Sequence, residues 1–148
     1  MRVLVDADAC PRGAMEVVRR LQRSFGYGVV TVASFNHALE SWGAGHEHVV
    51  VGDESQATDM AVANRTRRGD IVVTQDWGLA ALALGRGALA LGPDGRIFNV
   101  ENIEHLLEER ELKARFRRGG GRTKGPSARG PADDRAFEAG LRQLLEQG

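Results

Sequence analysis

Short apolar runs alternate along the chain with longer segments of helical periodicity. The runs are too short for helices and are bounded by Gly, Asp or charged residues, as is typical of strands buried on both faces of a parallel sheet. They predict five strands, over residues 3–5, 29–33, 49–51, 71–74 and 88–91.

The segments between these runs predict helices. Val17 and Leu21 recur at helical spacing after Pro11, which has no amide hydrogen to lose at a helix start. Further helices are expected over residues 55–67, 79–84 and 102–116. Strands and helices therefore alternate, which predicts an α/β fold with a parallel central sheet of about five strands flanked by helices.

The end of the chain has a different composition. Residues 117–132 are rich in Gly, Pro and basic side chains, which do not form a packed core. Residues 133–148 return to helical spacing, with Phe137 and Leu141 in an apolar stripe. We therefore divide the 148 residues into an α/β domain over 1–116, a basic loop over 117–132, and a C-terminal helix over 133–148 that docks on the domain or on a partner.

The chain has no net charge, but its charges are unevenly distributed. Residues 1–112 contain 11 Lys and Arg against 16 Asp and Glu, whereas residues 113–130 contain seven basic residues and no acidic ones. A basic segment on an acidic body suits a polyanion, so we expect a nucleic-acid partner. The side chains expected to contact phosphates are Arg117, Arg118, Arg122 and Lys124. The alternative is a solvated linker to the last helix.

Cysteine content and hydropathy indicate the compartment. Cys10 is the only cysteine, so no intrachain disulfide can form, which fits a reducing cytosol. Asp6 and Asp8 interrupt the N-terminal apolar run, which therefore does not resemble a signal peptide. The apolar run over 79–84 is far shorter than the roughly 20 residues that a membrane-spanning helix needs. We expect a cytoplasmic protein with no membrane partner.

Acidic side chains follow several of the predicted strands. Asp6 and Asp8 close the first strand. Asp59 lies in the helix after the third strand, and Asp76 follows the fourth. The carboxyl ends of parallel strands meet at one edge of a sheet, where ligands bind in open α/β folds. Carboxylates clustered there can hold Mg²⁺ or Mn²⁺, which activate water for phosphodiester hydrolysis.

These carboxylates also have purely structural explanations. Asp76 could be the N-cap of the next helix, and Asp8 could cap the first helix. Asp53 and Glu54 have the composition of a solvated turn. Asp6 is the hardest to explain in this way, because it directly continues a buried strand, where a charge needs compensation.

Several segments resemble a known family. They are residues 5–11 (VDADACP), 52–59 (GDESQATD) and 69–76 (GDIVVTQD), followed by residues 120–126 and 134–137. Together they resemble the uncharacterised bacterial YaiI/YqxD family, which belongs to the PIN-like group, over nearly the whole chain. The resemblance implies a single PIN-like domain with a parallel α/β fold. Many PIN-like domains are Mg²⁺-dependent ribonucleases.

The resemblance also implies residue roles. Asp6, Asp59 and Asp76 match the catalytic, metal-binding acids. Thr74 matches a small hydroxyl residue near the last acid and is expected to contact the substrate. The usual fourth acid has no obvious match; Asp8 is the first candidate for this metal ligand and Asp94 the second. The implied activity is a nuclease that uses Mg²⁺ or Mn²⁺, with RNA as the expected substrate.

Two other functions fit parts of the sequence. A haloacid-dehalogenase-type phosphatase also has an Asp-x-Asp motif after its first strand, with Asp6 as nucleophile and Asp8 as general acid. That mechanism needs a lysine in the body of the domain, and the first lysine here is Lys113, beyond all five predicted strands. A non-catalytic RNA-binding module would use the basic segment, with Trp42, Trp77 or Phe116 stacked on bases, although a place in the core is the alternative for Trp77.

Overall fold

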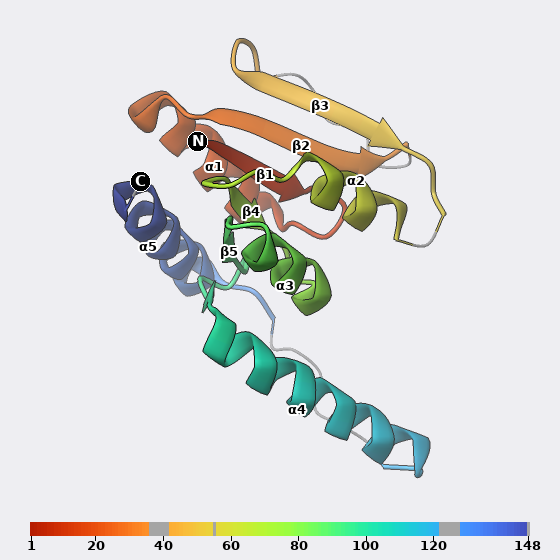
Figure 1. The fold of residues 1–148 in the computed structure, drawn as a ribbon. Coiled ribbons are helices and arrows are strands. Elements are labelled where there is room, and N and C mark those ends of the chain that lie inside the picture. Colours follow the sequence, from red (N-terminus) through yellow and green to blue (C-terminus); the bar gives the residue numbers. More distant parts are fainter. Residues whose placement is uncertain (36–41, 55, 122–127, 148) are drawn as a thin grey trace.

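A six-stranded sheet forms the centre of the computed structural model, which describes residues 1–35, 42–54, 56–121 and 128–147 (Figure 1). The strand order is β3-β2-β1-β4-β5-β6; β1 to β5 are parallel, and β6 is antiparallel to β5. The strands are β1 (Arg2–Asp6), β2 (Gly28–Ser34), β3 (His46–Val51), β4 (Ile71–Val73), β5 (Leu89–Leu91) and β6 (Ile97–Phe98). The five parallel strands expected from the apolar runs are confirmed, and β6 is an addition to them.

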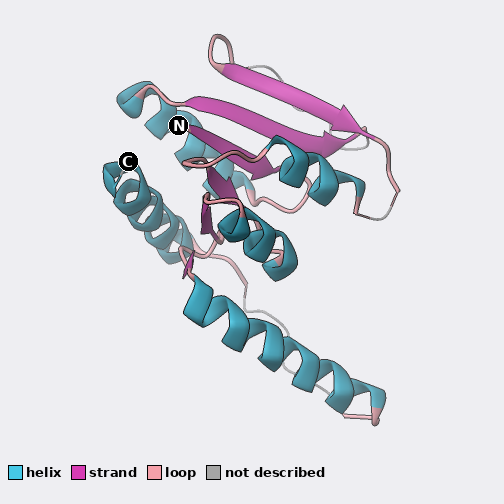
Figure 2. Cartoon of the chain, in the orientation of Figure 1, coloured by secondary structure: helices cyan, strands magenta, loops and turns pink. Residues whose placement is uncertain are grey.

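Helices cover both faces of the sheet (Figures 1 and 2). Side chains of α1 (Arg12–Phe25) and α5 (Pro131–Gln147) pack on one face. Those of α2 (Ala57–Arg65), α3 (Trp77–Gly85) and the first half of α4 (Val100–Arg118) pack on the other. The expected α/β fold class is confirmed, and the architecture is consistent with a single PIN-like domain. No helix within the described ranges combines the length and hydrophobicity needed to cross a bilayer.

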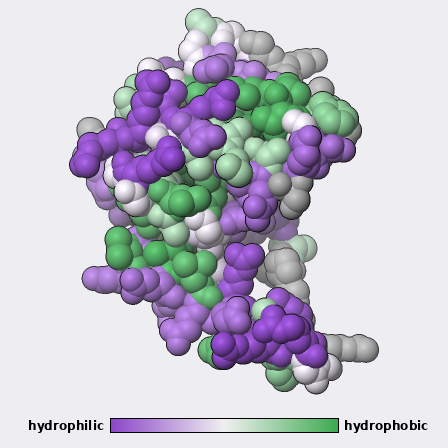
Figure 3. Space-filling view, turned by 45° about the vertical axis from the view of Figure 1, so that its right-hand side comes forward, coloured by the Kyte–Doolittle hydropathy of each residue, from purple (hydrophilic) through white to green (hydrophobic). Residues whose placement is uncertain are grey.

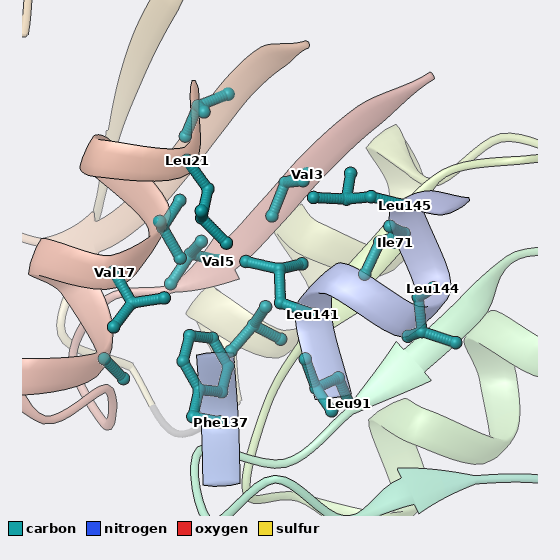
Figure 4. Packing of buried hydrophobic residues seen from close by; sticks show 14 of the residues in the cluster. Val3, Val5, Val17, Leu21, Ile71, Leu91, Phe137, Leu141, Leu144 and Leu145 are labelled. Carbon is teal, nitrogen blue, oxygen red and sulfur yellow. The ribbon is translucent and has the colours of Figure 1, made fainter. Parts of the chain in front are cut away.

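The C-terminal helix is part of the main hydrophobic core (Figure 4). Phe137 and Leu141 of α5 are fully buried and lie between the strands and α1, near Leu21. Gly140 permits this close packing, because a Cβ atom there would lie 2.9 Å from the carbonyl oxygen of Gly95. Burial of such side chains contributes roughly 1.5–3 kcal/mol each to folding. α5 therefore docks on the sheet of its own chain.

One helix boundary bears on the basic segment. α4 continues as far as Arg118, beyond the position at which the sequence suggested the start of a loop. Arg117 and Arg118 therefore lie on the last turn of a helix that extends away from the body of the molecule (Figure 1). Residues 122–127, which include the expected phosphate contacts Arg122 and Lys124, lie outside the described ranges.

Candidate functional site

The strand order creates a topological switch point between β1 and β4. β1 is central and pairs with β2 on one side and with β4 on the other. The chain leaves β1 for α1 on one face of the sheet and leaves β4 for α3 on the opposite face. In open α/β sheets, ligands bind in the crevice that such a switch opens at the carboxyl edge. Asp6 ends β1 at this point, and Thr74 and Asp76 follow β4.

Asp6 is a buried carboxyl group among other carboxyl groups. Its residue is only 6% exposed. Burial raises the pKa of Asp6 from 3.8 to about 6, and the negative charges of Asp59, Asp8 and Asp76 add to this increase. A hydrogen bond from the Ala9 backbone has a smaller, opposite effect. Asp8, Asp59 and Asp76 therefore all lie within electrostatic reach of Asp6. Placing them together destabilises the fold when all four are ionised.

Asp59 and Asp76 form the closest pair in this group. Burial, the charge of Asp76 and a side-chain hydrogen bond between the two carboxyl groups raise the pKa of Asp59. Two carboxyl groups can share such a hydrogen bond only if one of them carries a proton. Asp59 thus keeps its proton to a higher pH than an isolated aspartate does.

Asp76 has a structural role as well. Its Oδ1 atom accepts a hydrogen bond of 2.9 Å from the backbone N–H of Leu79, as the N-cap of α3. Its own backbone N–H donates to the Thr74 Oγ1 atom at 3.0 Å. Thr74 is almost completely buried and so fixes the turn that aims Asp76. The capping explanation for Asp76 is correct, and it coexists with membership of the carboxylate cluster.

Asp8 holds the loop after β1 in place. Its carboxylate accepts hydrogen bonds from the backbone N–H of Ser34, at 3.0 and 3.1 Å, and from the Thr58 Oγ1 atom at 3.0 Å. These contacts link the loop to the end of β2 and to α2. The expectation that Asp8 might cap the first helix is wrong, because the N-cap position of α1 is Pro11 and no side chain caps it.

Two hollows flank the four aspartates. The smaller one, of about 390 Å³, is lined by Asp6, Asp8 and Asp59 together with Asp53 and Glu54. We call it the acidic hollow. Asp53 and Glu54, expected to be a solvated turn, thus face the same space as the cluster. No basic residue is among the described residues that line it.

The larger hollow, of about 790 Å³, lies beside Asp76. Its walls consist of α4, the two segments that follow β4 and β5, and the segment that leads into α5. The basic residues that line it are Arg96, Arg110, Lys113, Arg117 and Arg129. We call this hollow the basic cleft. Its acidic lining residues are Asp76, Asp94 and Asp133, so positive charge is in excess.

Of the residues expected to contact phosphates, Arg117 and Arg118 lie in different surroundings in the structure. Arg117 lines the basic cleft, whereas Arg118 does not and lies 3.6 Å from Glu111 on the exposed side of α4. Arg96 and Arg110 were missed. Arg110 follows the helical spacing of the apolar residue Leu106, and that continuation was the available signal.

Asp94, the second candidate for a fourth acid, lies apart from the cluster. Its Oδ1 atom accepts a hydrogen bond of 3.0 Å from the backbone N–H of Arg96 in the turn between β5 and β6. Its charge is not among those that raise the pKa of Asp6. Within the described ranges, no three His, Cys, Asp or Glu side chains already converge on a common point that would suit a metal ion.

Comparison with known proteins identifies the relationship. A family model described as "Uncharacterized BCR, YaiI/YqxD family" matches residues 4–147. The chain belongs to the YaiI/YqxD family. It is 53% identical over 147 residues to the UPF0178 protein of Heliobacterium modesticaldum, covering 99% of this chain and 98% of that relative. It is 43% identical over 147 residues to the UPF0178 protein of Exiguobacterium sibiricum, with coverage of 99% and 98%. No solved structure matches the chain.

The segments that carry the YaiI/YqxD resemblance converge in the structure. Residues 5–11 supply Asp6, residues 52–59 supply Asp59, and residues 69–76 supply Asp76. These segments are far apart in the sequence, yet the charges of Asp59 and Asp76 raise the pKa of Asp6, and that of Asp76 raises the pKa of Asp59. Three of the segments that carry the resemblance therefore bring their carboxyl groups together at the switch point.

Proposed function

We propose that this protein hydrolyses phosphodiester bonds in nucleic acid, RNA in particular, with the help of Mg²⁺ or Mn²⁺. The observation that supports this proposal is the convergence of Asp6, Asp8, Asp59 and Asp76 at the switch point. Such a cluster destabilises the fold when ionised, and a divalent cation would relieve that cost. The excess positive charge in the adjoining basic cleft suits a phosphodiester substrate.

The chemistry of the donor set fits a hard divalent cation. All of the candidate ligands are carboxylates, which Mg²⁺ and Mn²⁺ prefer. The charge of Asp76 helps to raise the pKa of Asp59, and a cation between the two carboxylates would relieve this repulsion. These two residues and Asp6 would hold the metal. Asp8, through Ser34 and Thr58, would keep the adjoining loop in position.

The bound cation would supply an activated water molecule and neutralise charge that develops on the phosphate. The remaining tasks fall to the chain itself. Thr74 sets the direction of Asp76, and α2 brings Asp59 to the same point. The basic cleft would hold the substrate next to Asp76.

A phosphatase that uses Asp6 as nucleophile has less support. Its general acid would be Asp8, but both oxygens of the Asp8 carboxylate accept hydrogen bonds from Ser34, and one also accepts a bond from Thr58, so the side chain already holds the end of β2 and α2. Lys113 lies on α4, outside the strands that position Asp6. Neither feature helps to transfer a phosphoryl group to Asp6.

Cleavage of labelled nucleic acids tests the proposal. The protein is incubated with single-stranded and duplex RNA and DNA in Mg²⁺, in Mn²⁺ and in excess chelator, alongside the Asp59→Asn variant. We expect cleavage of RNA with either metal, none in chelator, and a loss of about a hundredfold or more in the variant. Cleavage that persists in chelator would contradict metal dependence. Binding without cleavage under any condition would leave the RNA-binding module as the better description.

A further inference from the structure

One face of α4 changes from apolar to basic along its length. Ile103 and Leu106 are buried against the body, and the same spacing of three and four residues leads to Arg110, Lys113 and Arg117. All three basic residues line the basic cleft. The face that anchors the first half of the helix therefore presents a row of positive charges where the helix leaves the body. In Figure 3, side chains over the lower end of the molecule, where α4 lies, are mostly hydrophilic.

The opposite wall of the cleft has different chemistry. It contains Gln75, Asp76 and Trp77, at the start of α3, and therefore one edge of the carboxylate cluster. Trp77 is only partly buried against the core, and it also lines the cleft. Arg129 adds a fixed positive charge at the end of the cleft, because its guanidinium donates to the Pro93 carbonyl at 2.7 Å and pairs with Asp134.

We propose that the basic cleft binds one strand of nucleic acid, with its phosphates along the Arg110–Lys113–Arg117 row of α4 and a base against Trp77. This proposal rests on the proposed function and names the form of its substrate. A groove of positive charge with an aromatic platform is the arrangement by which proteins hold single strands. Lys113 pairs with Glu109 at 3.1 Å, but that exposed ion pair is weak enough for a phosphate to replace it.

Trp77 in the lining of the cleft favours a single strand over a duplex. A volume of about 790 Å³ lies in the range of pockets that hold one small ligand, roughly 300–1,000 Å³. It accommodates a few nucleotides of one chain, whose bases are free to contact protein. A duplex keeps its bases paired and stacked, so it offers none of them to Trp77.

Fluorescence anisotropy in excess chelator measures binding without cleavage. The probe is a fluorescein-labelled single-stranded RNA of about ten nucleotides, a length within the site size of a single-strand binding fold. The Arg110→Gln/Arg117→Gln variant loses two charges from the cleft. We expect at least a tenfold loss of affinity at low salt. The slope of log affinity against log salt concentration should become shallower by about 1.4, for two phosphate contacts to a single strand.

A matched control separates the cleft from general surface charge. Arg23→Gln/Arg115→Gln also removes two charges; Arg115 pairs with Glu111 at 3.2 Å, and neither residue lines the basic cleft. This variant should lose less than threefold in affinity. Trp77→Leu should weaken binding while leaving the salt slope unchanged, because stacking releases no counterions.

The outcomes distinguish this inference from the proposed function. Equal losses in the two double variants, tighter binding of the duplex form of the probe, or no binding of the probe by the wild-type protein would overturn the cleft assignment, even if metal-dependent cleavage is observed. Binding with the expected cleft dependence, but without cleavage in any metal, would overturn the proposed hydrolysis and leave the cleft assignment in place.

Discussion

Replacing Asp6 with asparagine is expected to stabilise the metal-free protein at pH 8 by as much as about 3 kcal/mol. The pKa of the Asp6 carboxyl rises from 3.8 to about 6 in the folded protein, chiefly because of burial and then because of Asp59, Asp8 and Asp76. Each pKa unit corresponds to about 1.4 kcal/mol of free energy. Asparagine occupies nearly the same volume without a charge, so the substitution removes the cost of ionising Asp6 and leaves the packing intact.

The pH dependence of this effect has a definite sign. Below pH 3.8 Asp6 is protonated in both the folded and the unfolded protein, and its ionisation costs nothing. Between pH 3.8 and about 6 the unfolded chain releases the proton more readily than the folded protein, so the wild type loses stability relative to the variant. Above about pH 6 the difference is constant. Urea unfolding of both proteins across this range measures it.

Asp94→Asn is the matched control for Asp6→Asn. Asp94 is an exposed aspartate in the turn between β5 and β6, and its charge does not contribute to the raised pKa of Asp6. The free energy of unfolding of Asp94→Asn should change with pH in nearly the same way as that of the wild type. If the free energies of unfolding of the wild type and Asp6→Asn change with pH in the same way, the ionisation of Asp6 does not destabilise the fold.

Asp76 allows its two roles to be separated by two substitutions. Asparagine is as good an N-cap as aspartate, so Asp76→Asn should keep the hydrogen bond to Leu79 and retain the stability of α3. Asp76→Ala loses the cap, which costs about 1 kcal/mol. Both substitutions remove a proposed metal ligand, and both should lower the rate of RNA cleavage by about a hundredfold or more.

Rates and unfolding free energies of the two Asp76 variants are to be compared with the wild type. Equal activity losses with unequal stability losses support a role for the charge of Asp76 beyond capping. Wild-type activity in Asp76→Asn would reduce Asp76 to a helix cap and remove it from the proposed site.

Most of the fold was predictable because the parallel strands, apart from β3 at the edge of the sheet, are largely buried on both faces. Ile71–Val73 and residues 3–5 are wholly apolar, and such runs stand out in the sequence. β6 (Ile97–Phe98) has only two residues at the edge of the sheet, which is too short for any pattern. The C-terminal helix could be recognised by its apolar stripe, but its partner could not, since the stripe shows that a face is buried and not what covers it.

The candidate site was predictable in part. The position of Asp6 after a buried strand suggested a functional carboxylate from local sequence alone. The proximity of Asp59 to Asp76 depends on how α2 packs beside β1 and α3, a long-range arrangement that the family resemblance indicated and that periodicity does not contain. The spacing from Leu106 places Arg110 on the face of α4 that packs on the body, but it does not reveal a cleft, because an arginine on an ordinary solvated face has the same pattern.

Calorimetric titration with Mn²⁺ is the most direct test of the central claim that the four aspartates form a cation site. We expect the wild-type protein to bind Mn²⁺ with release of protons near pH 6, because a cation displaces the proton held by Asp6, whose pKa is raised to about 6. Asp6→Asn and Asp76→Asn should bind at least about tenfold more weakly, and Asp94→Asn should bind like the wild type. Equal Mn²⁺ affinity in all four proteins, or no binding by the wild type, would contradict it.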